Sequence, residues 1–149
     1  MPSAFPFPVP SSLPGQIPTP PATPASNDVA QRCVNDINQY RATQGLPALA
    51  RWADGEACAT TEARDDSQTG QAHGTFGRCQ ERSQNACPGW PGAPEAVIDG
   101  CLKMMWNEGP GPGSEHGHYT NMVDTKVSRV ACGTYVMPGG RVWAVQDFK

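Results

Sequence analysis

The chain has 149 residues, a net charge of −3 and a pI near 5.5, and this length permits one domain with a real core. Lysine and arginine are scattered singly, so the sequence lacks the basic stripe that would indicate nucleic-acid binding. No run of about 18 or more apolar residues occurs, and we therefore expect no transmembrane segment.

Residues 1–25 differ in composition from the rest of the chain. They hold nine of the sixteen prolines, with serine, alanine and threonine between them. Such a segment favours extended polyproline II backbone and cannot close a hydrophobic core. It also lacks the charged and apolar regions of a signal peptide. We interpret it as a flexible N-terminal spacer, with recognition of the Pro18 to Pro21 run by a partner as the alternative.

Two helices are predicted after this spacer. Residues Ser26–Asp28 offer an N-cap, apolar residues then recur at helical spacing as far as Tyr40, and Gly45 ends the helix. A second helix is expected from about Trp52 to Asp66, a stretch rich in alanine and glutamate. It carries a face of small residues that permits close packing: Ala53, Ala57, Thr60 and Ala63.

A glycine-rich stretch follows from Gly70 to Trp90 and carries His73 in a loop. A third helix is predicted from Pro94 to Glu108, since proline suits the first helical turn. Spacings of four, four and three place four residues on one stripe of this helix: Val97, Cys101, Met105 and Glu108.

Because the rest of that stripe is apolar, Glu108 is aimed inward. It also lies at the helix C-terminus, where the helix dipole disfavours a negative charge by roughly 0.3–1 kcal/mol. An inward carboxylate in this place requires a protonated histidine, a metal ion or a hydrogen-bond donor as its partner. The alternative is a solvated glutamate at a frayed helix end.

Nine residues then return the chain beside the end of this helix and lead to His118. Alternation of apolar residues predicts a strand over residues 130–136, a turn at Pro138-Gly139-Gly140 and a second strand over residues 141–148. In the second strand, one face carries Val142, Ala144 and Phe148, and the other carries Trp143 and Val145.

Six cysteines in a small chain rich in glycine and proline indicate an oxidising compartment and three disulfides. No Cys-x-x-Cys occurs, which argues against zinc-binding cysteines. From neighbourhood alone, among the fifteen connectivities that are possible, we pair Cys33 with Cys58, Cys79 with Cys87, and Cys101 with Cys132. We expect a secreted, extracellular protein whose thiols are all paired.

The segment Gly117-His118-Tyr119-Thr120, preceded by a helix that ends Met105-Trp106-Asn107-Glu108 and followed by an apolar strand, resembles the CAP superfamily. This superfamily holds cysteine-rich secretory proteins, insect venom antigens and plant pathogenesis-related proteins. The resemblance covers roughly residues 29–148. It implies an α+β fold, a three-layer α-β-α sandwich with a small antiparallel sheet, and we expect residues 26–149 to form this domain.

The resemblance also implies a central cleft lined by two histidines and two acidic residues. By this resemblance His118 and Glu108 are the second histidine and the second acid, and Ala72-His73 supplies the first histidine. The first acid is expected eleven residues after His73, where this chain has Gln84. This departure puts any mechanism that needs two carboxylates in doubt. We also place His116 and Tyr119 at the cleft, with His116 more exposed than liganding.

His73, His118 and Glu108 suit Zn²⁺, which binds imidazole nitrogen and carboxylate oxygen and leaves a fourth position to water. Gln84 is able to hold that water but not to act as a general base, because an amide does not ionise. We expect weak, reversible zinc binding, with a metal-free structural cleft as the alternative. A metal-activated hydroxide that attacks an ester or peptide, with Glu108 as the candidate catalytic residue, is a further alternative.

Two functions therefore stay open. The first is a secreted binding module, and the family resemblance implies a small apolar ligand such as a sterol or lipid. The second is a metal-assisted esterase or peptidase that uses the same cleft. The chain has no Gly-x-Ser-x-Gly and no phosphate loop, and Gln84 favours binding over catalysis. A third possibility, without a binding or catalytic role, is an extracellular structural domain tethered by the proline-rich segment. We expect a monomer.

Overall fold

The computed structural model describes residues 28–149. The spacer predicted at residues 1–25 lies outside the described residues, as do Ser26 and Asn27 of the expected N-cap. The first described residue, Asp28, is the N-cap of the first helix, and its side chain accepts a hydrogen bond from the backbone N–H of Gln31 at 3.2 Å.

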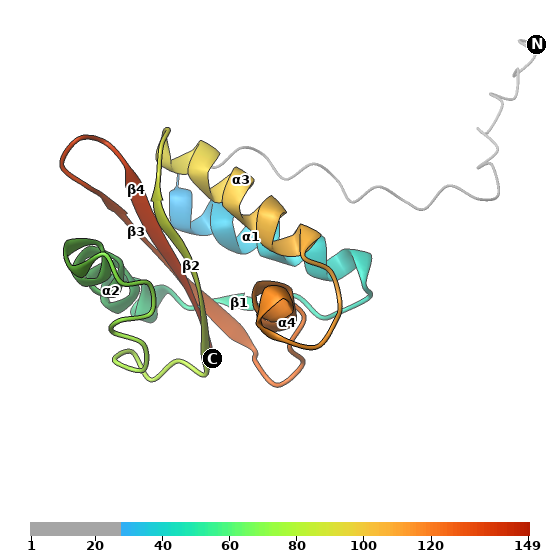
Figure 1. The fold of residues 1–149 in the computed structure, drawn as a ribbon. Helices are drawn as coiled ribbons and strands as arrows, with labels where there is room; N and C mark the ends of the chain where they lie inside the picture. Colours follow the sequence, from blue (N-terminus) through green and yellow to red (C-terminus); the bar gives the residue numbers. More distant parts are fainter. Residues whose placement is uncertain (1–27) are drawn as a thin grey trace, which may run out of the picture.

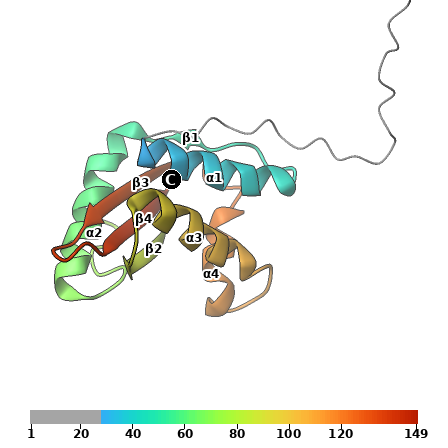
Figure 2. The same ribbon diagram turned by 90° about the horizontal axis from the view of Figure 1, so that it is seen from above.

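The fold is a three-layer sandwich in which helices cover both faces of a four-stranded sheet (Figure 1). Helices α1 (Val29–Thr43) and α3 (Pro94–Asn107) lie side by side on one face, together with the short α4 (Gly117–Met122). Helix α2 (Glu56–Thr69) covers the opposite face, as the turned view also shows (Figure 2). Within residues 28–149, none of the helices has the length and apolar character needed to cross a bilayer.

The sheet has the strand order β1 (Ala50–Arg51), β3 (Arg129–Val136), β4 (Val142–Phe148) and β2 (Ser83–Trp90). Strand β4 pairs antiparallel with both β2 and β3, whereas the two-residue β1 runs parallel to β3. Short 3-10 turns at Ala53–Gly55 and Ser114–His116 precede α2 and α4. The predicted α+β sandwich is confirmed, and its sheet is antiparallel except for β1.

The alternation predicted for the last strand divides the core into two layers. Val142, Ala144 and Phe148 pack in the cluster beneath α1 and α3. Trp143 and Val145 pack in the second cluster beneath α2. Because successive side chains of a strand point to opposite faces, β4 is buried along its whole length.

Strand β2 was not predicted, because its sequence contains proline and glycine and reads as part of a glycine-rich loop. It nevertheless pairs with β4 residue by residue from Ser83, opposite Phe148, to Cys87, opposite Ala144. The register then shifts between Cys87 and Trp90, around Pro88. Tertiary pairing therefore overrides the low strand propensity of this segment.

All six cysteines are paired, as predicted, but the three predicted pairings are wrong. The disulfides are Cys33–Cys132, Cys58–Cys79 and Cys87–Cys101. Helices α1 and α2 lie on opposite faces of the sheet, so Cys33 does not meet Cys58 and reaches β3 instead. Cys87 enters the layer beneath α3 and meets Cys101, which leaves Cys79 to join α2.

The packed face of α2 also differs from the prediction. Its buried residues are Ala59, Glu62, Ala63 and Asp66, and only Ala63 belongs to the small face that was expected. The backbone of α2 approaches the sheet most closely at Gly133 of β3. A Cβ atom added to Gly133 would lie 2.3 Å from the backbone of Ala59. The buried stripe therefore carries two carboxylates into the layer between α2 and the sheet.

Candidate functional site

Glu108 follows the last turn of α3, and its carboxylate is held by the first residues of α4. Oε2 accepts a hydrogen bond from Nδ1 of His118 at 2.6 Å, and Oε1 accepts from the backbone N–H of His118 at 3.0 Å and of Tyr119 at 3.4 Å. The Glu108 side chain is 18% exposed. The prediction of an inward glutamate with a hydrogen-bonding partner is thus confirmed, and that partner is a histidine.

His73 lies in the loop after α2, with a backbone φ of 62°. Its Nδ1 is 2.9 Å from Oε1 of Gln84. The side-chain nitrogen of Gln84 donates to Glu62 Oε2 and to Asp147 Oδ1, both at 2.8 Å. Because these two carboxylates fix the orientation of the amide, Oε1 of Gln84 is an acceptor and Nδ1 of His73 carries the proton.

The two histidines therefore share one feature. In each, Nδ1 donates to an oxygen, of Gln84 for His73 and of Glu108 for His118. In a neutral ring the other nitrogen, Nε2, then carries the lone pair that binds a metal. Metal-ligating histidines usually donate their second ring nitrogen to a carboxylate or carbonyl oxygen in this manner.

Two asparagines connect these pairs. Asn85, which follows Gln84 in β2, donates its side-chain N–H to the carbonyl of His118 at 3.1 Å. Asn121 of α4 donates to the carbonyl of Gln84 at 3.3 Å and to Oδ1 of Asn85 at 2.9 Å. Helix α4 is thereby tied to the strand that carries Gln84.

A depression of about 300 Å³ lies on the His73 side of this arrangement. Its lining residues are His73, Phe76, Arg82, Ser83, Gln84 and Asn121. Glu108 and His118 do not belong to that lining. The structure therefore brings the four predicted cleft residues together as two pairs, and their convergence on one shared cleft stays a prediction.

His116 and Tyr119, which were also placed at the cleft, support the elements around it. Nδ1 of His116 bonds the carbonyls of Glu108 at 2.8 Å and Gly109 at 2.9 Å, and so caps the C-terminus of α3. Tyr119 is buried, and its ring lies 4.7 Å from that of Trp106, which stacks on Tyr40. These contacts show packing by Tyr119 and capping by His116, and a place for either residue at the cleft stays a prediction.

A possible metal-binding group that was not predicted lies beneath Gln84. One carboxylate oxygen each of Glu62, Glu81 and Asp147, together with the disulfide sulfur of Cys79, lie within 4.8 Å of one another, and all four residues are buried. Burial, together with the charge of Asp147, raises the pKa of Glu62 to about 8. Burial likewise raises the pKa of Asp147 to about 6. The spacing of Ala59, Glu62, Ala63 and Asp66 on one helical stripe was the available signal in the sequence.

These raised pKa values predict that stability falls as the pH rises. Between the ordinary carboxyl pKa and the raised folded-state pKa, the folded protein binds protons that the unfolded chain has released, so the free energy of unfolding decreases from about pH 4 to about pH 8. Asp36, whose pKa burial raises to about 7, adds to the same slope. The charges of Asp66 and Glu81, which face Glu62, act in the same direction.

We expect Glu62→Gln to keep the shape of this side chain and to remove more than about 1 kcal/mol of the loss between pH 5 and pH 8, since one pKa unit corresponds to about 1.4 kcal/mol. Denaturant unfolding in the presence of a chelator measures this. Glu115→Gln, at an exposed acid, is the control and should keep the wild-type slope. An unchanged slope in Glu62→Gln would contradict the prediction.

Comparison with known proteins adds a family match. The family model described as the cysteine-rich secretory protein family, CAP, matches residues 34–148. No curated protein matches the chain. Among solved structures, BmVAL-1 is similar with a TM-score of 0.63 and 16% identity, over 87% of this chain and 80% of that one.

An extracellular protein with an SCP domain from Bacillus anthracis is similar with a TM-score of 0.57 and 17% identity, over 86% of this chain and 45% of that one. At these identities, the structural likenesses show a shared fold and nothing further. The family match itself runs from within α1 to the end of β4, and so includes both histidine pairs.

Proposed function

The chain belongs to the cysteine-rich secretory protein family, and on this premise we propose that it is a secreted binding domain that holds a divalent metal ion between His73 and His118. Three disulfides, with no free cysteine in residues 28–149, support the extracellular part of this proposal. The extracellular location named for the similar Bacillus anthracis protein is in line with it.

One observation carries the metal proposal. Both histidines commit Nδ1 to an oxygen partner, which leaves each Nε2 as the ligating atom. Imidazole nitrogen suits Zn²⁺, and waters would complete its coordination. The oxygens of Glu108 already accept hydrogen bonds from His118 and Tyr119, so we propose that Glu108 orients His118. Two protein nitrogens imply binding that is weaker than in a closed four-ligand site and reversed by chelators.

Calorimetric titration with zinc tests this site through three matched asparagine variants. Asparagine preserves a side-chain N–H near the position of Nδ1 and removes the Nε2 ligand, and it tolerates the positive φ of His73. We expect His73→Asn and His118→Asn each to weaken zinc binding at least tenfold. His116→Asn, at a histidine that caps α3, should bind as the wild type does.

Zinc binds neutral imidazoles and competes with protons for them, so the affinity should also fall at acidic pH. Equal heats from the wild type and His118→Asn would refute the site. A loss in His116→Asn as large as that in His118→Asn would place the ion elsewhere.

Hydrolysis is not the function that we propose. A bound metal ion would supply an activated water, but Gln84 stands where an ionisable base is needed, and its amide nitrogen is committed to Glu62 and Asp147. The carboxylate of Glu108 is engaged by His118. The geometry supports the binding of a metal ion better than turnover of a substrate.

We also propose that the domain takes a small apolar ligand such as a sterol or lipid, and a second surface feature supports this. A groove of about 610 Å³ lies where the start of α1 meets α2 and β3. Its lining includes Val29, Ala30, Ala57, Pro94 and Val136. Val136 is 51% exposed and adds apolar surface to the wall of the groove.

Titration with a fluorescent sterol measures occupancy of this groove. Ala57→Phe, on α2, fills the groove and should weaken sterol binding at least tenfold. Ala96→Phe adds the same ring at an exposed position of α3 that does not line the groove, and should leave binding unchanged. Equal binding by both variants would exclude the groove as the sterol site.

A further inference from the structure

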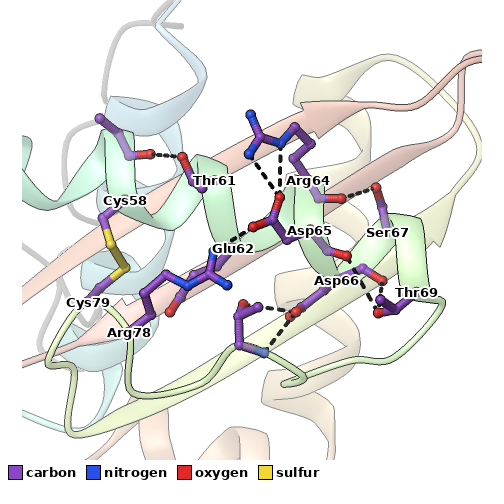
Figure 3. Close-up of polar contacts among 12 residues, drawn as sticks. Cys58, Thr61, Glu62, Arg64, Asp65, Asp66, Ser67, Thr69, Arg78 and Cys79 are labelled. Atoms are coloured by element: carbon purple, nitrogen blue, oxygen red, sulfur yellow. Dashed lines mark hydrogen bonds and ion pairs between the residues drawn. A yellow bond between two sulfur atoms is a disulfide. The ribbon is translucent and has the colours of Figure 1, made fainter.

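Three buried carboxylates meet between α2 and the sheet, on the far side of Gln84 from His73. Glu62 comes from α2, Glu81 from the loop before β2, and Asp147 from β4. Their exposed fractions are 0%, 7% and 0%. One oxygen of each lies within 4.8 Å of the others and of the sulfur of Cys79. Glu62 and the Cys58–Cys79 disulfide are drawn in Figure 3.

Each of these carboxylates has one bonded oxygen and one without a partner. Glu62 Oε2 and Asp147 Oδ1 accept from Gln84, and Glu81 Oε1 accepts from the backbone N–H of Gly77. The second oxygens, Glu62 Oε1, Glu81 Oε2 and Asp147 Oδ2, are fully buried and have no hydrogen-bond partner among residues 28–149. A buried, unpaired acceptor costs about 1–3 kcal/mol, and more when it is charged. A proton shared between Glu62 and Asp147 would join these two groups by a hydrogen bond, which leaves Glu81 Oε2 without a partner among the described residues.

No basic side chain of the described part of the chain forms an ion pair with these acids. Arg78, on the neighbouring loop, pairs instead with Asp65 at 2.5 Å (Figure 3). Buried carboxylates without a counter-charge are strongly unfavourable. The cluster is therefore neutralised either by a bound cation or by protons that the carboxyl groups share.

We propose that the carboxylates of Glu62, Glu81 and Asp147 bind a calcium ion. The donors are hard carboxylate oxygens, and the only sulfur nearby among the described residues belongs to a disulfide, so the set does not suit a thiolate-bound metal. Two oxygens on opposite sides of Ca²⁺ lie about 4.8 Å apart, given bonds of about 2.4 Å, which accommodates the observed spacing. Ca²⁺ takes about six to eight oxygens and accepts bidentate carboxylates, so three carboxylates are able to supply most of its ligands without water. Mg²⁺ has shorter bonds and retains several waters, for which a buried cluster has little room.

This calcium site is separate from the histidine site, but two of its carboxylates are hydrogen-bonded to Gln84, which in turn is hydrogen-bonded to His73. Glu62 and Asp147 hold the amide of Gln84, and Gln84 holds His73. A calcium ion that fixes the two carboxylates therefore also fixes the orientation of Gln84. The proposal does not depend on metal binding by His73 and His118, so the two sites are testable independently.

Calorimetric titration of the full chain with CaCl₂ at pH 7.5, after chelator treatment and dialysis, tests the proposal. We expect one calcium ion per chain and a thermal midpoint that rises by several degrees at saturation. Glu81→Gln should weaken calcium binding at least tenfold. Glutamine keeps the acceptor for Gly77, and the side-chain hydrogen bonds of Gln84 go to His73, Glu62 and Asp147 rather than to Glu81. The exposed Glu115→Gln is the charge-matched control and should bind as the wild type does.

Several outcomes would overturn the proposal. Absence of heat and of a thermal shift at millimolar calcium would mean that protons alone neutralise the cluster. Undiminished binding by Glu81→Gln would place the ion elsewhere, and Glu62→Gln repeats this test if Glu81→Gln does not fold. His118→Asn must retain calcium binding, since loss of both zinc and calcium in that variant would indicate a single histidine site.

Discussion

Gly133→Ala is expected to lower the free energy of unfolding by about 3 kcal/mol, at the upper end of the usual cost of overpacking a core. A Cβ at this position would lie 2.3 Å from the carbonyl carbon of Ala59 and from the backbone nitrogen of Thr60. Both are backbone atoms of α2, so no side-chain rotation relieves the clash. The whole helix must move away from β3, and Glu62 moves with it.

Gly117→Ala is the matched control for this substitution. Gly117 has a helical backbone, with φ −62° and ψ −40°, and no atom lies within 4 Å of an added Cβ. The same methyl group should therefore be neutral, or stabilising by up to about 1 kcal/mol. Denaturant unfolding of both variants decides the matter. A loss below about 1 kcal/mol in Gly133→Ala would show that the contact between α2 and the sheet is looser than described.

Removal of the Cys33–Cys132 disulfide, by alanine at both positions, should cost the most of the three disulfides. Its two cysteines are 99 residues apart in sequence, whereas Cys58–Cys79 and Cys87–Cys101 span 21 and 14. The chain-entropy model gives about 4.7 kcal/mol for a loop of about 100 residues and about 3 kcal/mol for one of about 15. The long link joins α1 to the central β3 and so restricts nearly the whole domain in the unfolded state.

The three double-alanine variants, compared by denaturant unfolding under non-reducing conditions, test this order. The two short links serve as controls, because each variant makes the same pair of Cys→Ala changes. A larger loss from removing Cys58–Cys79 than from removing Cys33–Cys132 would contradict the entropic ranking.

Local periodicity was enough to predict the elements that bury one clear face. Helix α3 begins at Pro94, as expected, and its buried stripe includes Val97, Cys101 and Met105. The two faces of β4 separate as the alternation indicated, with Phe148 and Trp143 on opposite sides of the sheet. In both cases the pattern within the segment is itself the physical cause of its orientation.

The disulfide pairing and strand β2 depend on how the helices and strands pack against one another, and periodicity within a segment did not predict them. The disulfide pairing requires knowledge of which helix covers which face, and sequence neighbourhood placed Cys33 with Cys58 although the sheet separates their helices. Strand β2 forms because β4 offers it a partner, in spite of Pro88 and Gly89. Long-range pairing decided both outcomes.

The candidate site was predictable only in part, for a related reason. The position of Glu108 on an apolar stripe indicated its inward direction, and His118 supplies the partner. Glu62 and Asp147 were missed, because a carboxylate in an alanine-rich helix or an apolar strand is ordinarily predicted to face solvent. Their contacts with Gln84 appear only once α2, β2 and β4 lie together.

The proposed histidine site is tested most directly by a crystal structure of the full chain grown with zinc, with anomalous diffraction recorded at the zinc edge. The account predicts one anomalous peak within bonding distance, about 2.0–2.1 Å, of Nε2 of both His73 and His118, with Nδ1 of each ring still bonded to Gln84 and Glu108. A peak bound to only one of these histidines, or no peak between them, would contradict it.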